Sequence, residues 1–165
     1  RQRQMCIRDR FGSAVYTPMD EKHPLQAQSP YAASKIAADQ ACMSYFHSYN
    51  VPIIILRPFN TYGPRQSNRA VIPTIINQIL NKNKQLKIGS VFPTRDFTFV
   101  EDTVEAFICA LNNKNIYGEQ FNLGISKDFS ILETIKLISK LMNYELKLRP
   151  EKIRKRPLKL SLIHI

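Results

Sequence analysis

The hydrophobic and polar positions of this chain predict helices and strands in alternation. Ser29 and Pro30 precede a long alanine-rich segment, which predicts a helix over residues 30–50 with Ser29 as its N-cap and Pro30 at its first position. Small residues lie on several faces of this helix, so we expect it to be buried on two sides. Residues 51–56 form a continuous apolar run with many β-branched side chains, typical of a strand covered on both faces in a parallel sheet.

The rest of the chain continues this alternation. Ser130 and Glu133 have the spacing of a capping box and predict the start of one helix, while Asp102 is expected to cap an earlier one. The expected helices are 71–81, 103–112 and 130–142, and the expected strands are 86–88, 96–100 and 120–123. This order predicts an α/β fold in which 51–56 and 120–123 share a parallel sheet with an exposed apolar edge.

The composition narrows the class of protein. With 165 residues, 44% of them hydrophobic and 22% charged, the chain is one globular domain or part of one. No apolar run approaches the ~18 residues of a spanning helix, and we expect a cytoplasmic protein that is not embedded in a membrane. No disulfide or metal-ligand pattern occurs, so we expect no metal, structural roles for His23 and His47, and core positions for Cys42 and Cys109.

The net charge of +11 raises the question of nucleic acid as a partner. Most of this charge lies near the two ends, and the body of the chain is nearly neutral. The basic stretch at 147–156 lacks interleaved aromatic residues and a recognition motif, so we expect a solvated face and no nucleic-acid partner. A small basic nucleic-acid-binding module is kept as a distant alternative, which a steep salt dependence of DNA binding would favour.

The two ends do not match the body of the chain. The strings RQRQMCIRDR and LSLIHI have no periodicity or capping pattern and resemble translated sequencing-adapter read-through. We therefore expect residues 1–10 and 158–165 to be non-native, with 11–157 forming the substrate-side part of a larger domain. The alternative is a genuine basic arm and a genuine apolar tail.

Tyr31 and Lys35 are four residues apart near the start of the first expected helix and therefore share one of its faces. An ammonium ~4 Å from a phenol, at an effective dielectric of ~20, favours the phenolate by about 4 kcal/mol, or roughly three pKa units. Such a tyrosine can act as a general acid or base near neutral pH. The spacing also occurs by chance in many helices, so a packed tyrosine beside a solvated lysine is the alternative.

Several strings occur in an order that is more specific than this pair. They are DEKHPLQAQSPYAASKIAAD, LRPFNTYGPRQ, GSVFPTRDFTFVEDTVEAF and FNLG. Together they resemble the extended short-chain dehydrogenase/reductase family of NAD-dependent nucleotide-sugar epimerases and dehydratases, over residues 11–157. The finer likeness is to 4,6-dehydratases acting on UDP-N-acetylglucosamine or a relative. The resemblance implies a Rossmann-like fold, but no G-x-G-x-x-G loop is present, so the N-terminal nucleotide-binding half is expected to be missing.

The resemblance also implies residue roles. Tyr31 would exchange the proton of the sugar 4-hydroxyl, and Lys35 would hold the nicotinamide ribose of NAD, which is preferred over NADP. Pro58 and Phe59 would lie along the nicotinamide. The substrate-binding residues implied are Asn60 at the sugar, Arg65 on the substrate side, Arg95 at the diphosphate and Arg156 as a second nucleotide contact.

Three positions depart from the family pattern. Ile7 stands where the family has a catalytic Ser or Thr, and Arg8 and Asp9 stand where a 4,6-dehydratase has its acid/base pair. We assign no catalytic role to Asp9. The chain by itself is therefore expected to be catalytically silent, and the residues that separate a dehydratase from an epimerase cannot be read in it.

The alternatives within the family are a nucleotide-sugar epimerase and a nucleotide-sugar decarboxylase, and a pseudoenzyme or structural fragment is a further one. The intact parent is expected to be a homodimer. In this family the tyrosine helix packs in a four-helix bundle with the partner, and Ala33, Ile36 and Ala37, on the face away from Tyr31, suit that packing.

Overall fold

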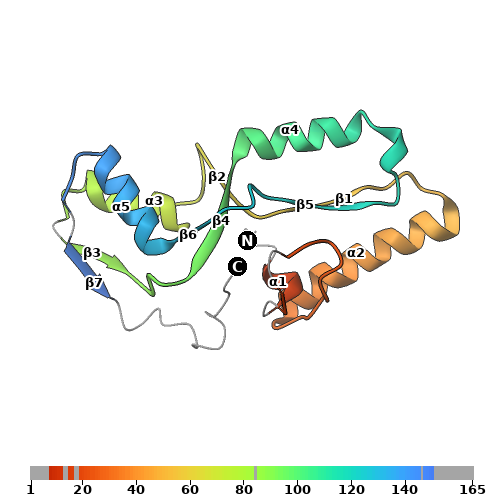
Figure 1. Ribbon diagram of the computed structural model, residues 1–165, viewed down its shortest axis with the longest axis horizontal. Coiled ribbons are helices and arrows are strands. Elements are labelled where there is room, and N and C mark those ends of the chain that lie inside the picture. The colour runs from red at the N-terminus through yellow and green to blue at the C-terminus, as the bar shows by residue number, and fades with distance from the viewer. Residues whose placement is uncertain (1–7, 13–14, 17–18, 84, 146, 151–165) are drawn as a thin grey trace. The chain divides into compact units, whose positions relative to one another are not determined.

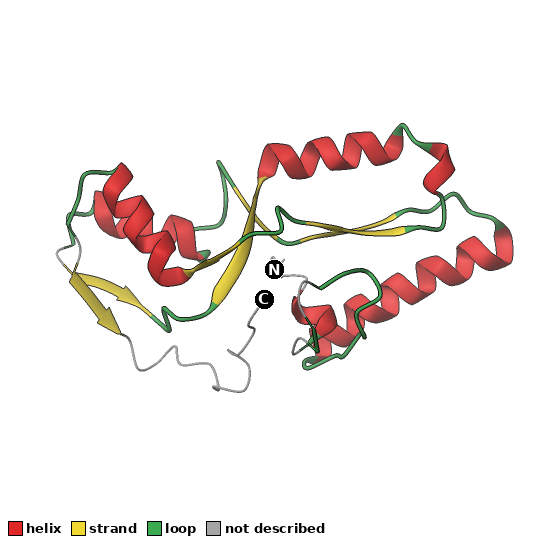
Figure 2. Ribbon diagram, viewed as in Figure 1, coloured by secondary structure: helices red, strands yellow, loops and turns green. Residues whose placement is uncertain are grey.

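A computed structural model describes residues 8–12, 15–16, 19–83, 85–145 and 147–150 (Figures 1 and 2). The chain divides into two compact units. The described residues of the first unit lie within Arg1–Thr61 and Asp96–Lys127, and those of the second lie within Tyr62–Arg95 and Asp128–His164. The α/β class expected from the sequence is confirmed.

The first unit is built on a pair of parallel strands. Strands β1 (Ile55–Pro58) and β5 (Gln120–Leu123) pair in the register Ile55↔Gln120, which confirms the expected parallel arrangement. The helices α2 (Pro30–Tyr49) and α4 (Val100–Leu111) lie on either side of this pair (Figure 1). The unit also contains α1 (Arg8–Phe11), η1 (Lys114–Ile116), most of β2 (Asn60–Tyr62) and most of its neighbour β4 (Thr94–Phe99).

The first strand is shorter than the apolar run that predicts it. Strand β1 begins at Ile55, and Val51 is exposed. Pro52 has no N–H to give to a ladder. The carbonyl of Ile53 accepts from the N–H of Gly118, and strand pairing follows where the N–H of Ile55 donates to the carbonyl of Glu119. Ile55 and Arg57 are buried and their neighbours Leu56 and Pro58 are half-buried, so the strand is covered on both faces as expected, one face more fully than the other.

Helix α2 begins as the sequence predicts. Pro30 is its first residue, and the Oγ of Ser29 accepts a hydrogen bond from the N–H of Ala32 at 3.1 Å. The helix ends at Asn50, whose φ of 52° is left-handed and reverses the chain. Only Ala32 and Asp39 of this helix are buried, so the expectation of burial on two sides is wrong for the described chain.

The predicted start of helix α5 is correct, and the predicted start of helix α4 is wrong. Helix α5 (Ile131–Leu141) has the predicted capping box, with Ser130 and Glu133 bonded reciprocally. Helix α4 begins at Val100, directly after strand β4, and Phe99 occupies the N-cap position. The expectation that Asp102 caps this helix is therefore wrong. Its exposed carboxylate lies in the first turn, where it faces the positive end of the helix dipole.

The second unit has its own apolar core. Helix α3 (Val71–Leu80) packs against α5 and against strand β3 (Gln85–Ile88), and strand β6 (Asp128–Ser130) precedes α5. Strand β7 (Lys147–Pro150) pairs with β3 in parallel, although the sequence predicted only a solvated face there. The buried apolar residues of this unit are Ile75, Ile79, Leu86, Ile88, Ile131 and Ile135.

The cysteines and histidines have mixed outcomes. Cys42 and Cys109 are exposed, so their expected core positions are wrong. His23 is buried, its Nε2 accepts from the N–H of Val15, and its Nδ1 lies 3.0 Å from the carbonyl oxygen of Pro24, which confirms a structural role. His47 is exposed near the end of α2.

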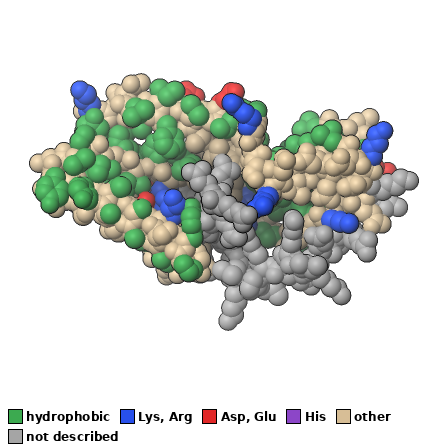
Figure 3. Space-filling view, turned by 180° about the vertical axis from the view of Figure 1, so that it is seen from behind, with side chains coloured by type: hydrophobic (Ala, Val, Ile, Leu, Met, Phe, Trp, Pro, Cys, Tyr) green, Lys and Arg blue, Asp and Glu red, His purple; other side chains and the backbone are tan. Residues whose placement is uncertain are grey.

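Several large apolar side chains on α4 are exposed. They are Val104, Phe107, Ile108 and Leu111, with exposed fractions of 51%, 44%, 53% and 78%. Figure 3 shows hydrophobic side chains gathered over the surface of the first unit. Among the described residues, no helix combines the length and apolar character that crossing a membrane requires.

Candidate active site

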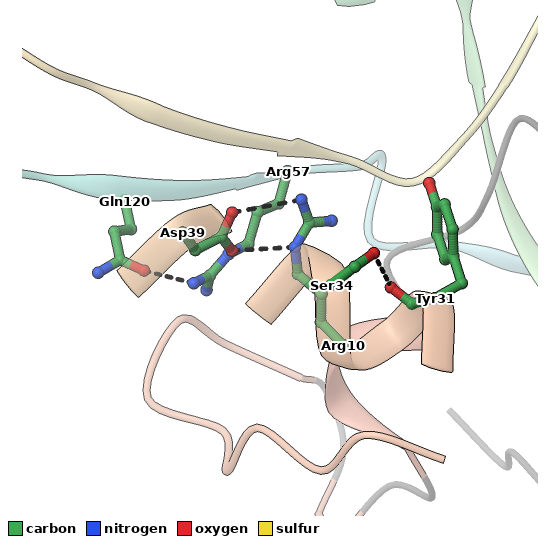
Figure 4. Close-up of polar contacts among 6 residues, drawn as sticks. All are labelled: Arg10, Tyr31, Ser34, Asp39, Arg57 and Gln120. Atoms are coloured by element: carbon green, nitrogen blue, oxygen red, sulfur yellow. Dashed lines mark hydrogen bonds and ion pairs between the residues drawn. The ribbon is translucent and has the colours of Figure 1, made fainter. Parts of the chain in front are cut away.

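Tyr31 and Lys35 lie on one face of α2, as their spacing predicts. Tyr31 is half-buried in the first turn, and its backbone carbonyl accepts from the Oγ of Ser34 at 2.8 Å (Figure 4). The Nζ of Lys35 lies 5.4 Å from the centroid of the Tyr31 ring, a cation–π arrangement. A phenol and an ammonium are thus presented together at one end of the helix.

A buried ionic cluster joins this helix to the parallel strands. Arg57 of β1 is 1% exposed, and its Nε donates to Oδ2 of Asp39 at 3.0 Å. Its Nη2 donates to the side-chain oxygen of Gln120 on β5. The Nε of Arg10 lies 2.9 Å from the same Asp39 oxygen (Figure 4). The cluster therefore ties α2 to both strands of the parallel pair.

Sequence reasoning missed this cluster. The signal that could have found it is an arginine within the otherwise apolar run before Pro58, together with one aspartate among the small residues of the tyrosine helix. A charge inside a buried strand needs a partner, and Asp39 is buried on the neighbouring helix. Arg10 belongs to the segment that the sequence suggests is non-native, and that suggestion stays a prediction.

Pro58, Phe59 and Asn60 come together where β1 ends. Pro58 is in register with Leu123 at the end of β5, and the N–H of Phe59 donates to the carbonyl of Leu123 at 2.8 Å. The Nδ2 of Asn60 donates to the backbone oxygen of Asp96 at 3.0 Å. The carboxyl ends of two parallel strands thus meet here, which is where open α/β sheets place their ligands.

Asp96 is a second residue that sequence reasoning missed. It is 5% exposed, and its carboxylate accepts the backbone N–H groups of Ile125 and Ser126, just beyond β5, at 3.0 to 3.2 Å. Burial raises the pKa of this carboxyl above its ordinary value, while the hydrogen bonds from Ile125 and Ser126 oppose the rise.

The loop before Tyr31 is fastened to β5. The N–H of Asn122 donates to Oε1 of Glu21 at 2.7 Å, and the side-chain amide of Asn122 donates to the carbonyl of Met19 at 3.4 Å. Met19 is also part of a small apolar core with Phe11, against which Phe59 packs. The loop that leads into α2 and the residue after β1 therefore pack in the same small apolar core.

The remaining candidate residues lie elsewhere in the chain. Arg65 and Arg95 belong to the second unit, whereas Tyr31 and Asn60 belong to the first. Arg65 is exposed in a turn with φ of 64°, and Nη1 of the half-buried Arg95 donates to the carbonyl of Thr94 at 2.6 Å. Arg156 lies outside the described residues.

Within the described part of the chain, no group of three or more His, Cys, Asp or Glu side chains is arranged to hold a metal ion. The arrangement instead suits proton transfer at a hydroxyl, because it offers a phenol with a neighbouring ammonium.

Comparison with known families decides where the chain belongs. The family model of GDP-mannose 4,6 dehydratase matches residues 4–159. The chain belongs to this family. The resemblance to extended short-chain dehydrogenases/reductases that act on nucleotide sugars is thereby confirmed.

Relatives of this family member include enzymes of both expected kinds. The human dTDP-D-glucose 4,6-dehydratase is 36% identical over 132 residues, which is 80% of this chain and 37% of that protein. The solved UDP-glucuronic acid 4-epimerase of Bacillus cereus, in complex with UDP-glucuronic acid and NAD, is 32% identical with a TM-score of 0.79, covering 87% of this chain and 46% of that one.

A third relative brings in an N-acetylated sugar. The UDP-N-acetylglucosamine 4-epimerase of Methanobrevibacter ruminantium, solved with UDP-N-acetylmuramic acid, is 30% identical with a TM-score of 0.80 and covers 95% of this chain and 51% of that one. The chain thus spans about half the length of these solved relatives and less than half of the human protein.

Proposed function

We propose that this chain is the substrate-side part of an NAD-dependent nucleotide-sugar 4,6-dehydratase in which Tyr31 is the general acid/base. The observation that carries the proposal is the pairing of Tyr31 with Lys35 at the start of α2, in a chain that belongs to a dehydratase family. Tyr31 would take the proton of the sugar 4-hydroxyl, and Lys35 would place a positive charge beside its ring. Its ammonium would also bind the ribose hydroxyls.

NAD is the cofactor that this site would use, and the residues fit one end of it. When bound, NAD supplies a hydride acceptor. A phenol and an ammonium on one helix face match the donors that a ribose needs, and Pro58 and Phe59 offer an apolar surface for the nicotinamide. The Bacillus cereus relative with 32% identity was solved with NAD, whereas RMD of Pseudomonas aeruginosa, with 26% identity, was solved with NADPH, so the greater identity supports NAD. No residue of this chain is assigned to the pyrophosphate.

The substrate class rests on fewer residues. Asn60 is held beside the ends of β1 and β5, where it would face the sugar. Arg95 would bind the diphosphate, because a planar guanidinium can make two charge-assisted bonds, and Arg65 and Arg156 would add contacts to the nucleotide. We propose a sugar of the UDP-N-acetylglucosamine type, supported by the 30% identity to the epimerase named for that substrate.

An epimerase of the same family is the second candidate. The epimerases with 30% and 32% identity and TM-scores near 0.8 favour it. A decarboxylase is a third candidate, and the product separates all of them. A dehydratase releases one water per sugar, a decarboxylase releases carbon dioxide, and an epimerase leaves the mass unchanged.

The test joins residues 11–157 of this chain behind the N-terminal half of the human dehydratase. The chimera is assayed with UDP-N-acetylglucosamine, dTDP-glucose and UDP-glucuronic acid, the last of which carries the carboxyl group that a decarboxylase removes. Products are separated by chromatography and identified by mass spectrometry. We expect Tyr31→Phe to lower kcat by about 10²–10⁴-fold, the usual contribution of a general acid or base, with little change in sugar-nucleotide affinity. Tyr45→Phe, on the same helix, is the matched control and should retain activity.

Several outcomes would count against the proposal. Equal loss in the two tyrosine variants would mean that the phenol of Tyr31 has no special role. Turnover with an unchanged product mass would favour the epimerase. NAD-dependent turnover by the 165-residue chain without any added half would show that the chain is not the partial site proposed here.

The diphosphate assignment has its own test in the chimera. Arg95→Lys should weaken binding of UDP and of UDP-sugar by about 1.5 to 3 kcal/mol, the range for hydrogen bonds to a charged group, and leave NAD affinity unchanged. Calorimetry that found NAD binding lost and UDP binding intact would assign Arg95 to the cofactor instead.

We also propose a homodimeric, cytoplasmic parent without a nucleic-acid partner. Ala33 and Ala37 on α2 are exposed and small, which suits close packing against a helix of a second copy. Sedimentation of the chimera as a monomer at all concentrations would contradict the dimer.

A further inference from the structure

The segment just beyond β5 is held by a single side chain of another strand. Asp96 comes from β4, and its two carboxylate oxygens receive the N–H of Ile125 at 3.2 and 3.1 Å and that of Ser126 at 3.0 Å. These are charge-assisted bonds at a residue that is 5% exposed. Ser126 adopts a left-handed φ of 56°, so the chain turns at the residue whose N–H the carboxylate accepts.

Gly124 leaves room for this carboxylate and an aromatic ring on the side where another residue would carry its Cβ. A Cβ at position 124 would lie 2.6 Å from Oδ2 of Asp96 and 2.6 Å from the ring of Phe59. Real Cβ atoms essentially never come so near to other atoms, so only glycine allows the carboxylate, the segment and the ring to pack together. The N–H of Phe59 is bonded to Leu123, immediately before this glycine.

The backbone of Asp96 holds the next residue of the site. Its carbonyl oxygen accepts the side-chain amide of Asn60 at 3.0 Å. Asp96 therefore bonds the segment after β5 through its carboxylate and Asn60 through its carbonyl, and its Oδ2 occupies space that only a glycine at position 124 leaves open. All of these residues belong to the first unit.

We propose that Asp96 is a positioning residue of the candidate active site, whose carboxylate clamps residues 125 and 126 next to Gly124 and the Phe59 ring, and whose backbone carbonyl holds the Asn60 amide. Asp96 itself touches neither substrate nor cofactor in this role. With the clamp in place, the Phe59 ring and the Asn60 amide have a single packed arrangement. A site whose groups are displaced by about 1 Å can lose about a hundredfold in rate. The geometry stands by itself, and only the effect on activity rests on the proposed function.

The first test uses nuclear magnetic resonance on the 165-residue chain. Asp96→Asn keeps the size of the side chain but replaces one acceptor oxygen by a donor, which cannot accept an N–H. We expect exchange of the Ile125 and Ser126 amide protons to accelerate by about ten- to hundredfold, as befits the loss of a charge-assisted bond. The signals of the Asn60 side-chain amide and of the Phe59 ring should shift with them.

Two glycine variants separate positioning from general destabilisation. Gly124→Ala keeps the Asp96 side chain, but its added Cβ would push the Asp96 carboxylate away from residues 125 and 126. Because this Cβ would also strike the Phe59 ring directly, the informative signal in this variant is that of the Asn60 amide, which should shift. Gly118→Ala is the matched control, because its Cβ would strike the ring of Phe46 and its φ is 87°, yet it lies away from the clamp. It should lower stability and leave the Asn60 and Phe59 signals unchanged.

The results that would overturn the proposal are specific. If amide exchange at Ile125 and Ser126 accelerates while Asn60 and Phe59 keep their signals, Asp96 only stabilises a turn. If Asp96→Asn does not fold, Gly124→Ala decides alone, and an unchanged Asn60 amide signal in that variant would also overturn the proposal.

The second test measures activity in the chimera. Asp96→Asn should lower kcat by about ten- to hundredfold while UDP affinity stays within twofold of the unmodified chimera. Loss of UDP affinity equal to the loss of kcat would point to a general collapse of the site. If the unmodified chimera has no turnover, the proposed function fails, and the resonance test on the chain still decides the positioning role.

Discussion

The buried ionic cluster on α2 offers a sharp test of what holds the first unit together. Asp39→Asn removes the negative charge while nearly keeping the volume. Arg57 would then remain 1% exposed with Gln120 as its partner and with the Phe11 ring 5.6 Å from its guanidinium carbon. Arg10 would lose its ion partner too, but its side chain is 15% exposed and can turn to water.

The magnitude follows from which charge is stranded. Removing one partner of a buried pair costs about 3–5 kcal/mol, because the other charge stays in a low-dielectric site. The side-chain carbonyl of the introduced asparagine can still accept one bond from Arg57, so we expect about 3 kcal/mol, the low end of this range. The double replacement Asp39→Leu with Arg57→Met removes both buried charges and should recover most of the loss.

Hydrogen exchange at the amides of Ile55 and Phe59 is the suitable assay, because they donate to the carbonyls of Glu119 and Leu123 along the β1–β5 pair and report on the first unit alone. A whole-chain melting curve would mix two units that can unfold in separate steps. Asp102→Asn, an exposed carboxylate in the first turn of α4, is the control and should cost about 0.3–1 kcal/mol. A cost below about 1 kcal/mol for Asp39→Asn, or a double variant no better than the single one, would refute the reasoning.

Three further predictions concern single hydrogen bonds. Ser29→Ala should destabilise the first unit by about 1 kcal/mol through loss of the α2 cap, measured by exchange of amides in that helix, whereas Ser29→Asp should not. The hydrogen bond from Tyr16 to Asp20 raises the pKa of Tyr16 to about 12. Asp20→Asn should therefore return this pKa toward 10.0 in an ultraviolet titration, and Tyr16→Phe identifies the signal of Tyr16. Hydrogen bonds from Ser130 hold the pKa of Glu133 below 4.5, so its contribution to stability is complete above that value and is lost as the pH falls through the lower folded pKa. Glu133→Gln should therefore speed amide exchange in α5 at pH 7, and the difference from the unmodified chain at matched pH should close as the pH falls below about 4.5.

The parts of the fold that the sequence predicted are those set by neighbouring residues. Ser29 with Pro30, and Ser130 with Glu133, mark helix starts because a cap acts within three residues. Asp102 misled because the true start of α4 depends on where β4 ends, which the local spacing of an acidic residue does not show. Strand β7 was missed for a similar reason, since its pairing partner β3 lies some sixty residues earlier in the chain.

In the candidate site, too, local pairs could be predicted from the sequence and tertiary pairs could not. Tyr31 and Lys35 could be predicted from their spacing, because a helix places residues four apart on one face. Asp39 with Arg57, and Asp96 with Ile125, are tertiary pairs whose members come from different elements. A single sequence shows that each charge exists but not which distant donor it meets, and so the residues that support the site were missed.

The wrong expectations of burial for α2, Cys42 and Cys109 have one physical origin, which is that whole faces of α2 and α4 are exposed. Val104, Phe107, Ile108 and Leu111 follow the i, i+3, i+4, i+7 pattern of a helix face that packs against something, yet all four are exposed. Cys42 and Cys109 are exposed on α2 and α4, the same two helices, so they fail together with the expected burial of α2. Periodicity reports which side chains a helix is able to bury, whereas exposure reports what the described chain places against them. The pattern on α4 therefore identifies a packing face correctly even where the prediction of a buried residue is wrong.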